Sequence, residues 1–330
     1  LLHWNLTLTN IFIGVLVIIY TVSGGTKAVT QTQKQQMAVM MGGMILAGIL
    51  VLNMLPEQIG LIDAMTIAGK MGKMNLINFE FDLDDRYNFW TGTTAALFLF
   101  LSYFGTDQSQ VQRYLTGKSL SESRLGLIMN GLLKVPMQFI ILFIGVLVFV
   151  FYQYNKPPVF FNKVELEQLK QSEYKMSVIE LEDRFSTLHE EKKRAIDLMI
   201  SNQSKKVNDE ILDQKILDLE DEMVEVREDV KALVKSNNPT AEINDKDYIF
   251  MSYVMDYLPH GIIGLLFAVM FSAAMSSTAS ELNALASTTT VDLYKRSMVK
   301  NKTDYHYLRS SKYFTFLWGI LAIVFATTAS

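Results

Sequence analysis

The sequence has 330 residues, of which 50% are hydrophobic, with a formal net charge of −4 and a mean hydropathy of +0.19. Its apolar residues come in blocks of about 20 rather than at the short periods of a soluble domain, which excludes an ordinary soluble globular protein. It contains no cysteine, so disulfides and thiol chemistry are excluded, and its four scattered histidines and near-neutral charge argue against a histidine metal site and nucleic-acid binding.

Six apolar segments are long enough, or nearly so, to cross a bilayer as helices of about 20 residues. They cover residues 8–23, 36–55, 89–105, 125–152, 261–287 and 313–330. The first residue is Leu1 rather than methionine, and the last apolar segment ends at Ser330. We therefore expect the sequence to be the middle of a longer membrane protein, with its last segment truncated.

The basic residues of the short loops predict the orientation of these segments, because loops rich in lysine and arginine stay in the cytoplasm. The first, third and fifth loops are basic, whereas the second is mainly acidic. Their basic residues are Lys27 and Lys34, then Arg113, Lys118 and Arg124, then Lys295, Arg296, Lys300, Lys302, Arg309 and Lys312. The pattern predicts a multi-pass protein of the inner or plasma membrane whose two ends and longest loop lie outside.

That longest loop, residues 153–259, has the composition of a soluble helical module. It divides the chain into membrane segments one to four (1–152), an extracytoplasmic insertion (153–259) and segments five and six (260–330). Apolar residues recur at alternating spacings of three and four, typical of a coiled-coil seam: Ile216, Leu219, Met223, Val226, Val230 and Leu233. A second helix over 163–200 and a turn at residues 201–204 predict a hairpin, which either packs only on itself or binds a partner.

The fifth segment carries the most informative polar residues. Ser276 and Ser277 offer two hydroxyl oxygens and Ala273, one turn earlier, a carbonyl oxygen, which are the neutral ligands that a sodium ion prefers. Alternatively, such small residues let helices pack closely or bond back to their own carbonyls. Glu281 follows Ser277 by one helical turn. Its carboxylate either takes part in coupling or pairs with a cation or water on the cytoplasmic side.

Four stretches together resemble the sodium/solute symporter family. Residues 271–294 resemble its sodium-site helix, 20–29 a turn between two core helices, and 103–113 its Gln-Arg motif, followed by 118–136. The resemblance implies a bacterial-type member of the sodium:glucose-like transporters with a long extracytoplasmic insertion. It also implies an all-α, inverted-repeat core of ten helices like that of the leucine transporter. The six segments would be core helices four to nine, with core helix one supplying further sodium ligands.

The same resemblance implies candidate residues for the solute. Lys134 matches a lysine that contacts sugar in the sugar-transporting branch, and Tyr103 matches its aromatic gate. Lys134 lies about 15 Å along the helix from Arg124, where a charge needs a partner or a task, unless it snorkels to the interface. Phe100 falls where that branch carries a sugar-binding asparagine, which disfavours a hexose. Tyr103 could equally be an ordinary interfacial tyrosine.

Two positions depart from the family pattern. Gln33 and Ala279 stand where members with a second sodium site carry an aspartate and a serine. The sequence therefore predicts a symporter that couples one sodium ion to the uptake of a small organic solute, such as a sugar or sugar acid. It would work by alternating access and use no cofactor besides the coupling ion. A membrane-anchored receptor using the coiled coil and an ion channel are the alternatives, and no residue pattern supports an enzyme.

Overall fold

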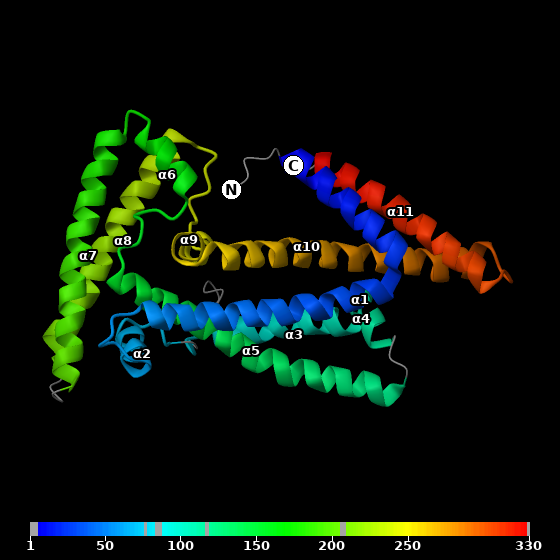
Figure 1. Cartoon of the computed structure of the whole chain (residues 1–330), viewed down its shortest axis with the longest axis horizontal. Helices are drawn as coiled ribbons and strands as arrows, with labels where there is room; N and C mark the ends of the chain where they lie inside the picture. Colours follow the sequence, from blue (N-terminus) through cyan, green and yellow to red (C-terminus); the bar gives the residue numbers. More distant parts are fainter. Residues whose placement is uncertain (1–5, 76–77, 83–87, 116–118, 205–208, 329–330) are drawn as a thin grey trace. The chain divides into compact units, whose positions relative to one another are not determined.

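The structure, a computed structural model, describes residues 6–75, 78–82, 88–115, 119–204 and 209–328 (Figure 1). Every regular element of these residues is helical, which confirms the predicted all-α class. The elements are α1 (Leu6–Met54), α2 (Leu61–Lys70), α3 (Phe89–Gly105), α4 (Gln108–Leu115), α5 (Leu120–Tyr154), α6 (Lys163–Lys170), α7 (Lys175–Ser204), α8 (Glu210–Asn237), α9 (Tyr248–Tyr257), α10 (His260–Thr288), the π-helix η1 (Thr289–Met298) and α11 (Asp304–Thr328).

Among the described residues, five helical stretches are long and apolar enough to cross a membrane. They are Thr7–Gly24, Gln33–Met54, Leu120–Tyr154, His260–Met298 and Asp304–Thr328. The remaining predicted segment is α3, whose bounds agree with the prediction but whose 17 residues make it slightly shorter than these. Its first turn is fixed by Asn88, whose side chain accepts a hydrogen bond of 2.8 Å from the backbone N–H of Thr91.

The loop expected between the first two segments is not a loop. α1 stays helical from Leu6 to Met54 and changes direction between its two apolar stretches (Figure 1). Ser23 and Thr21 donate their hydroxyls to carbonyls one turn earlier, and two glycines follow at 24 and 25. Both features let a helix bend without ending. The side chains of residues 25–30, including Lys27, lie outside the described part.

The chain divides into two compact units, and the first contains residues 1–43, 79–134 and 264–330. Within it α1 and α11 pack closely, because each presents a glycine to an isoleucine of the other. A methyl group added at Gly14 would collide with Ile323, and one added at Gly319 would collide with Ile18. Small residues at such crossings are typical of helix packing in membranes.

The second unit contains residues 44–78 and 135–263, and includes the predicted helical hairpin. α7 and α8 run side by side (Figure 1) over a core that includes Phe185, Met223 and Val226. Lys192, buried on α7, forms an ion pair with Glu220 of α8 at 2.5 Å. At the base of the hairpin, Arg227 and the backbone N–H of Phe161 both bind the carboxylate of Asp245. These charged contacts tie α8 to the chain on either side of the hairpin.

Three details of the hairpin differ from the prediction. The helix expected over 163–200 is broken into α6 and α7 at residues 171–174. The residues expected to form the turn, 201–204, are the last helical residues of α7. α8 begins at Glu210 and is capped by Asp209, and residues 205–208 lie outside the described part. The seam ends on Val234, which is 1% exposed, while the predicted Leu233 is only partly buried and packs against the edge of the core. A straight α-helix drifts about 20° per heptad, which rotates the next residue into the core.

Candidate functional site

Three serines spaced four residues apart form a polar stripe on α10. Gln36 of α1 donates from Nε2 to the carbonyl oxygen of Ser272 at 3.0 Å, and Gln33 donates to the hydroxyl of Ser280 at 3.2 Å. The Ser280 hydroxyl in turn donates to the carbonyl of Ser276 at 3.0 Å. Two amides of α1 thus bracket Ser276 from either side. Sequence reasoning missed Gln36, Ser272 and Ser280, although their four-residue spacing places the serines on one helix face.

Ser276 is the unsatisfied member of this stripe. Its side chain is 4% exposed, and its Oγ has no hydrogen-bond partner among the residues that the structure describes. An unpaired buried hydroxyl costs about 1–3 kcal/mol, so such groups usually serve a ligand, an ion or a water. The oxygen singled out from the sequence is therefore buried and available to bind a ligand.

Ser277 and Ala273 lie on the neighbouring side of α10. Ser277 is exposed and Ala273 is half-buried in the described chain. Successive helical residues point about 100° apart, so an ion that binds both hydroxyls must lie where the two faces meet. The carbonyl of Ala273 keeps a second lone pair beside its helical hydrogen bond. The three predicted oxygens therefore come from little more than one turn, with the exposed side open to further ligands.

Ala279, which stands where family members with a second sodium site carry a serine, is surrounded mainly by apolar side chains. Ala279 is fully buried in a cluster with Val17, Ile18 and Leu282. Neither the alanine nor these neighbours supply a side-chain oxygen. The side-chain amide of Gln33 donates a hydrogen bond to the hydroxyl of Ser280, as described above. A cation at Ala279 would lie in a cluster that is mostly hydrocarbon, where an unpaired charge is very costly.

The structure brings the predicted solute residues together where the C-terminal end of α3 meets the interior of α5. The ammonium nitrogen of Lys134 lies 5.3 Å from the centroid of the Tyr103 ring, a cation–π distance. Phe104 packs edge-on against Tyr103 at 4.9 Å and also contacts Phe100 at 6.0 Å. Within the described part of the chain Lys134 forms no ion pair. The result is a cation over an aromatic surface, with Phe100 55% exposed beside it.

In the described residues, the stretch that carries the Gln-Arg motif, 103–113, caps the start of α4 and connects α4 to α10. Asp107 accepts hydrogen bonds from the backbone N–H and hydroxyl of Ser109, which starts α4. From α4, Gln112 donates to the hydroxyl of Ser287 on α10 at 3.2 Å. The side chain of Arg113, like residue Lys118, lies outside the described part. Glu281 is exposed on the same side of α10 as Ser277, with no ion pair in the described residues.

A sequence model of the Sodium:solute symporter family matches residues 1–174 and 229–330. The chain belongs to this family. Its relatives are transporters rather than enzymes, and sodium is their coupling ion. The unmatched residues 175–228 cover α7 and most of α8, so most of the hairpin lies outside the part of the sequence that the family model matches. All the predicted sodium and solute residues lie within the matched parts.

Several relatives resemble parts of this chain. The human sodium/iodide cotransporter is 34% identical over 143 residues, which are 42% of this chain and 21% of that protein. The human sodium-coupled monocarboxylate transporter 1 is 32% identical over 117 residues, covering 36% and 19%. The sodium/sialic acid symporter NanT of Aliivibrio fischeri is 37% identical over 75 residues, covering 23% and 15%. The matches thus span about a fifth or less of these curated relatives.

The fold resembles that of a solved transporter. The substrate-bound outward-open structure of a Na+-coupled sialic acid symporter superimposes with a TM-score of 0.61 at 19% sequence identity. The superposition covers 98% of this chain and 50% of that one. The described helices therefore adopt a symporter fold and correspond to half of such a molecule.

Proposed function

We propose that this chain is part of a sodium-coupled symporter of the cell membrane, which takes up a small organic solute by alternating access. The observation that carries the proposal is the buried, unpaired hydroxyl of Ser276 on a membrane-spanning helix of a sodium:solute symporter. A helix that only anchors a receptor does not require a buried, unpaired hydroxyl within its membrane span. An ion of the size and hardness of sodium satisfies it.

In the proposed site, Ser276 and Ser277 supply hydroxyl oxygens and Ala273 a carbonyl oxygen. The hydrogen bonds of Gln33 and Gln36 to the flanking serines hold the stripe of α10 against α1 and leave the Ser276 oxygen free for the ion. Further ligands would approach from the exposed Ser277 side. Because Ala279 is enclosed by apolar side chains, the site takes one sodium ion per solute.

The solute would bind at Lys134 and Tyr103, and we propose that it carries an anionic group. Lys134 is a cation without an ion-pair partner in the described chain, beside a membrane-embedded aromatic surface. The substrates that name the relatives above are iodide, monocarboxylates and sialic acid. Phe100 removes a polar contact that a neutral sugar would use, so a sugar acid or another small carboxylate fits better than a hexose.

The proposed topology keeps the predicted division of the chain. Membrane segments lie within 1–152 and 260–330, and the charged region 153–259 lies outside the cytoplasm. The basic residues of the η1–α11 connection support this orientation under the positive-inside rule. Glu281 then lies toward the cytoplasmic end of α10, where it can meet a cation or water, and it serves as a candidate coupling carboxylate.

Uptake by the full-length protein tests the sodium site. Ser276→Ala and Ser277→Ala each remove one ligand oxygen with little change in volume, so the sodium concentration for half-maximal uptake should rise about tenfold or more. Thr278→Val is the matched control, because its hydroxyl already bonds back to the carbonyl of Ala274 at 3.0 Å. Normal sodium dependence in both serine variants would reject the site.

A further inference from the structure

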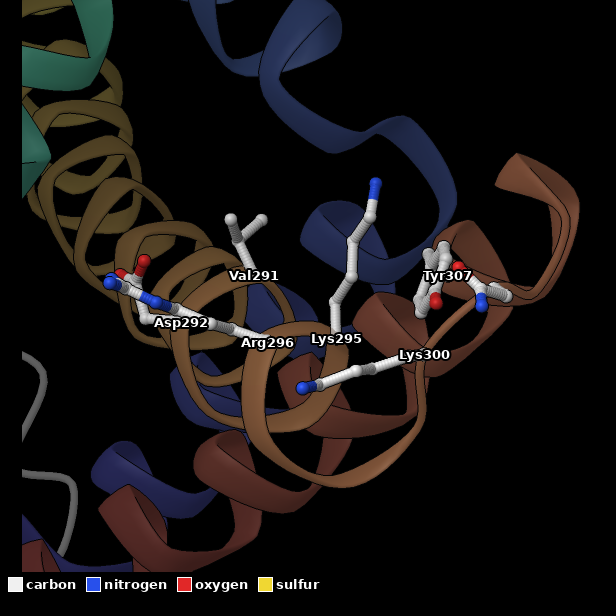
Figure 2. Close-up of a pocket in the computed structure, with 7 residues that line it drawn as sticks. Val291, Asp292, Lys295, Arg296, Lys300 and Tyr307 are labelled. Carbon is white, nitrogen blue, oxygen red and sulfur yellow. The ribbon is translucent and has the colours of Figure 1, made fainter.

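A shallow cavity of about 520 Å³ lies where η1 turns into α11. It is lined by Val291, Asp292, Lys295, Arg296, Lys300, Asn301 and Tyr307 (Figure 2). The residues come from the last turns of one membrane span and the start of the next, linked by residues 299–303. Figure 2 shows Lys300 reaching back from this link toward η1. None of these residues belongs to the proposed sodium or solute sites.

The backbone around the cavity is held in a defined shape. η1 ends in a π-type hydrogen bond of 2.8 Å from the N–H of Val299 to the carbonyl of Tyr294. The hydroxyl of Tyr307 donates to the carbonyl of Val299 at 2.8 Å and accepts from the N–H of Lys302 at 3.2 Å. Asn301 adopts a left-handed conformation, with φ of 60°. π-turns within helices are rare and often occur at functional sites.

The charges around the cavity are unbalanced. Lys295, Arg296 and Lys300 face a single acid, Asp292. Lys295 lies over the ring of Tyr307 at 4.7 Å. Neither Arg296 nor Lys300 forms an ion pair with any residue that the structure describes. The cavity therefore presents an excess of two positive charges. The guanidinium group of Arg296 and the ammonium group of Lys300 also carry N–H donors that suit the oxygens of a phosphate.

The cavity also lies at the ends of two helices that are long and apolar enough to cross a membrane, where lipid headgroups are expected. It caps two consecutive spans, His260–Met298 and Asp304–Thr328. Tyr305 and Tyr313 are exposed close by on α11, at 74% and 64%. Tyrosine is enriched at the membrane–water interface, where its ring is buried and its hydroxyl is hydrated. Basic hollows between membrane helices at this level are suited to anionic lipid headgroups.

We propose that this cavity binds a phosphate group, and specifically the headgroup phosphate of an anionic phospholipid. Arg296 and Lys300 would contact the phosphate oxygens, while Lys295 stays stacked on Tyr307 and contributes its charge. The acyl chains would lie along the exposed apolar side chains of η1 and α11, such as Leu293 and Leu308. The site is independent of the sodium and solute sites, so it stands even if their assignment fails.

Lipid binding to the purified full-length protein in neutral detergent tests the proposal, with native mass spectrometry counting bound phosphatidylglycerol and phosphatidylcholine. We expect the wild type to prefer phosphatidylglycerol. The double variant R296Q/K300Q should weaken that binding at least about tenfold, because each cation near a charged lipid contributes about fivefold. R296K/K300R, which keeps both charges, should bind nearly as well as the wild type.

The matched control is K302Q/K312Q, which removes the same charge from the same region but replaces no residue that lines the cavity and keeps the backbone N–H of position 302 that bonds to Tyr307. It should leave phosphatidylglycerol binding within about twofold. An equal loss in both double variants would overturn the site in favour of diffuse attraction. Displacement of the lipid by an equal concentration of inorganic phosphate would overturn the lipid assignment, leaving a site for free anions.

Discussion

The hairpin contains a histidine whose protonation should destabilise it. His189 on α7 is 1% exposed, and neither ring nitrogen has a hydrogen-bond partner among the described residues. Burial, reinforced by the positive charge of Lys192, lowers the pKa of His189 from 6.5 to about 4, and Glu190 opposes this only in part. The folded hairpin therefore keeps the ring neutral at a pH where the unfolded chain would protonate it.

The sign and size of the effect follow from proton linkage. Between pH 6.5 and about 4 the unfolded state binds the additional proton, so stability is complete above pH 6.5 and falls as the pH drops toward 4. At about 1.4 kcal/mol per pKa unit, a fully shielded ring would lose about 3 kcal/mol. The neighbouring charges of Glu190 and Lys193 reach water, which screens them, so we expect a loss of about 1–2 kcal/mol.

The assay is urea unfolding, followed by circular dichroism, of a fragment covering residues 157–247. This fragment should fold alone as a helical hairpin because it contains the whole apolar cluster from Val159 to Ala241. Stability is compared at pH 7 and pH 4.5 for the wild type, His189→Leu and His189→Gln. The difference between the two pH values should be about 1–2 kcal/mol larger in the wild type than in either variant, since neither variant titrates there. Identical pH dependence in all three proteins would refute the reasoning, and a random-coil spectrum would refute autonomous folding.

Two further predictions concern the solute site and the topology. Lys134→Ala should raise the solute concentration for half-maximal uptake about tenfold by removing a charged contact, and Tyr103→Phe, which keeps the ring under the ammonium group, should change it far less. Normal uptake kinetics in Lys134→Ala would disprove the assignment of the solute site. In whole cells, a cysteine introduced at the exposed position Glu222 should react with an impermeant thiol reagent, while one at Ser119 should not. The opposite labelling pattern would invert the proposed orientation.

The sequence predicted the elements of this fold better than their ends. The bounds of α3 and the apolar seam of α8 follow from composition and periodicity, and both are confirmed, with Val234 as an additional buried residue beside the partly buried Leu233. The continuity of α1 could not be predicted in this way. A pair of glycines such as residues 24 and 25 predicts a turn from sequence alone. In the structure this pair stays helical, next to a turn in which the hydroxyl of Thr21 bonds back to the carbonyl of Val17.

The site was predictable in its chemistry but not in its contacts. Hydroxyls on a membrane segment indicated sodium ligands, yet Ser276 and its neighbour Ser277 differ in burial because only one faces α1. That difference depends on Gln33 and Gln36, which are more than 230 residues from their serine partners. Periodicity reports which residues share a helix face, but not which helix covers that face.

Sodium-coupled transport itself is tested most directly by the reversal potential or flux ratio of the full-length protein, measured with its solute in proteoliposomes. The single oxygen-lined site at Ser276 and the apolar surroundings of Ala279 predict one sodium ion for each solute molecule. If Glu281 is a displaced ligand of a second ion, the ratio would be two in the wild type and one in Glu281→Gln. A ratio of two would contradict the single-site account, and solute flux independent of the sodium gradient would contradict sodium coupling altogether.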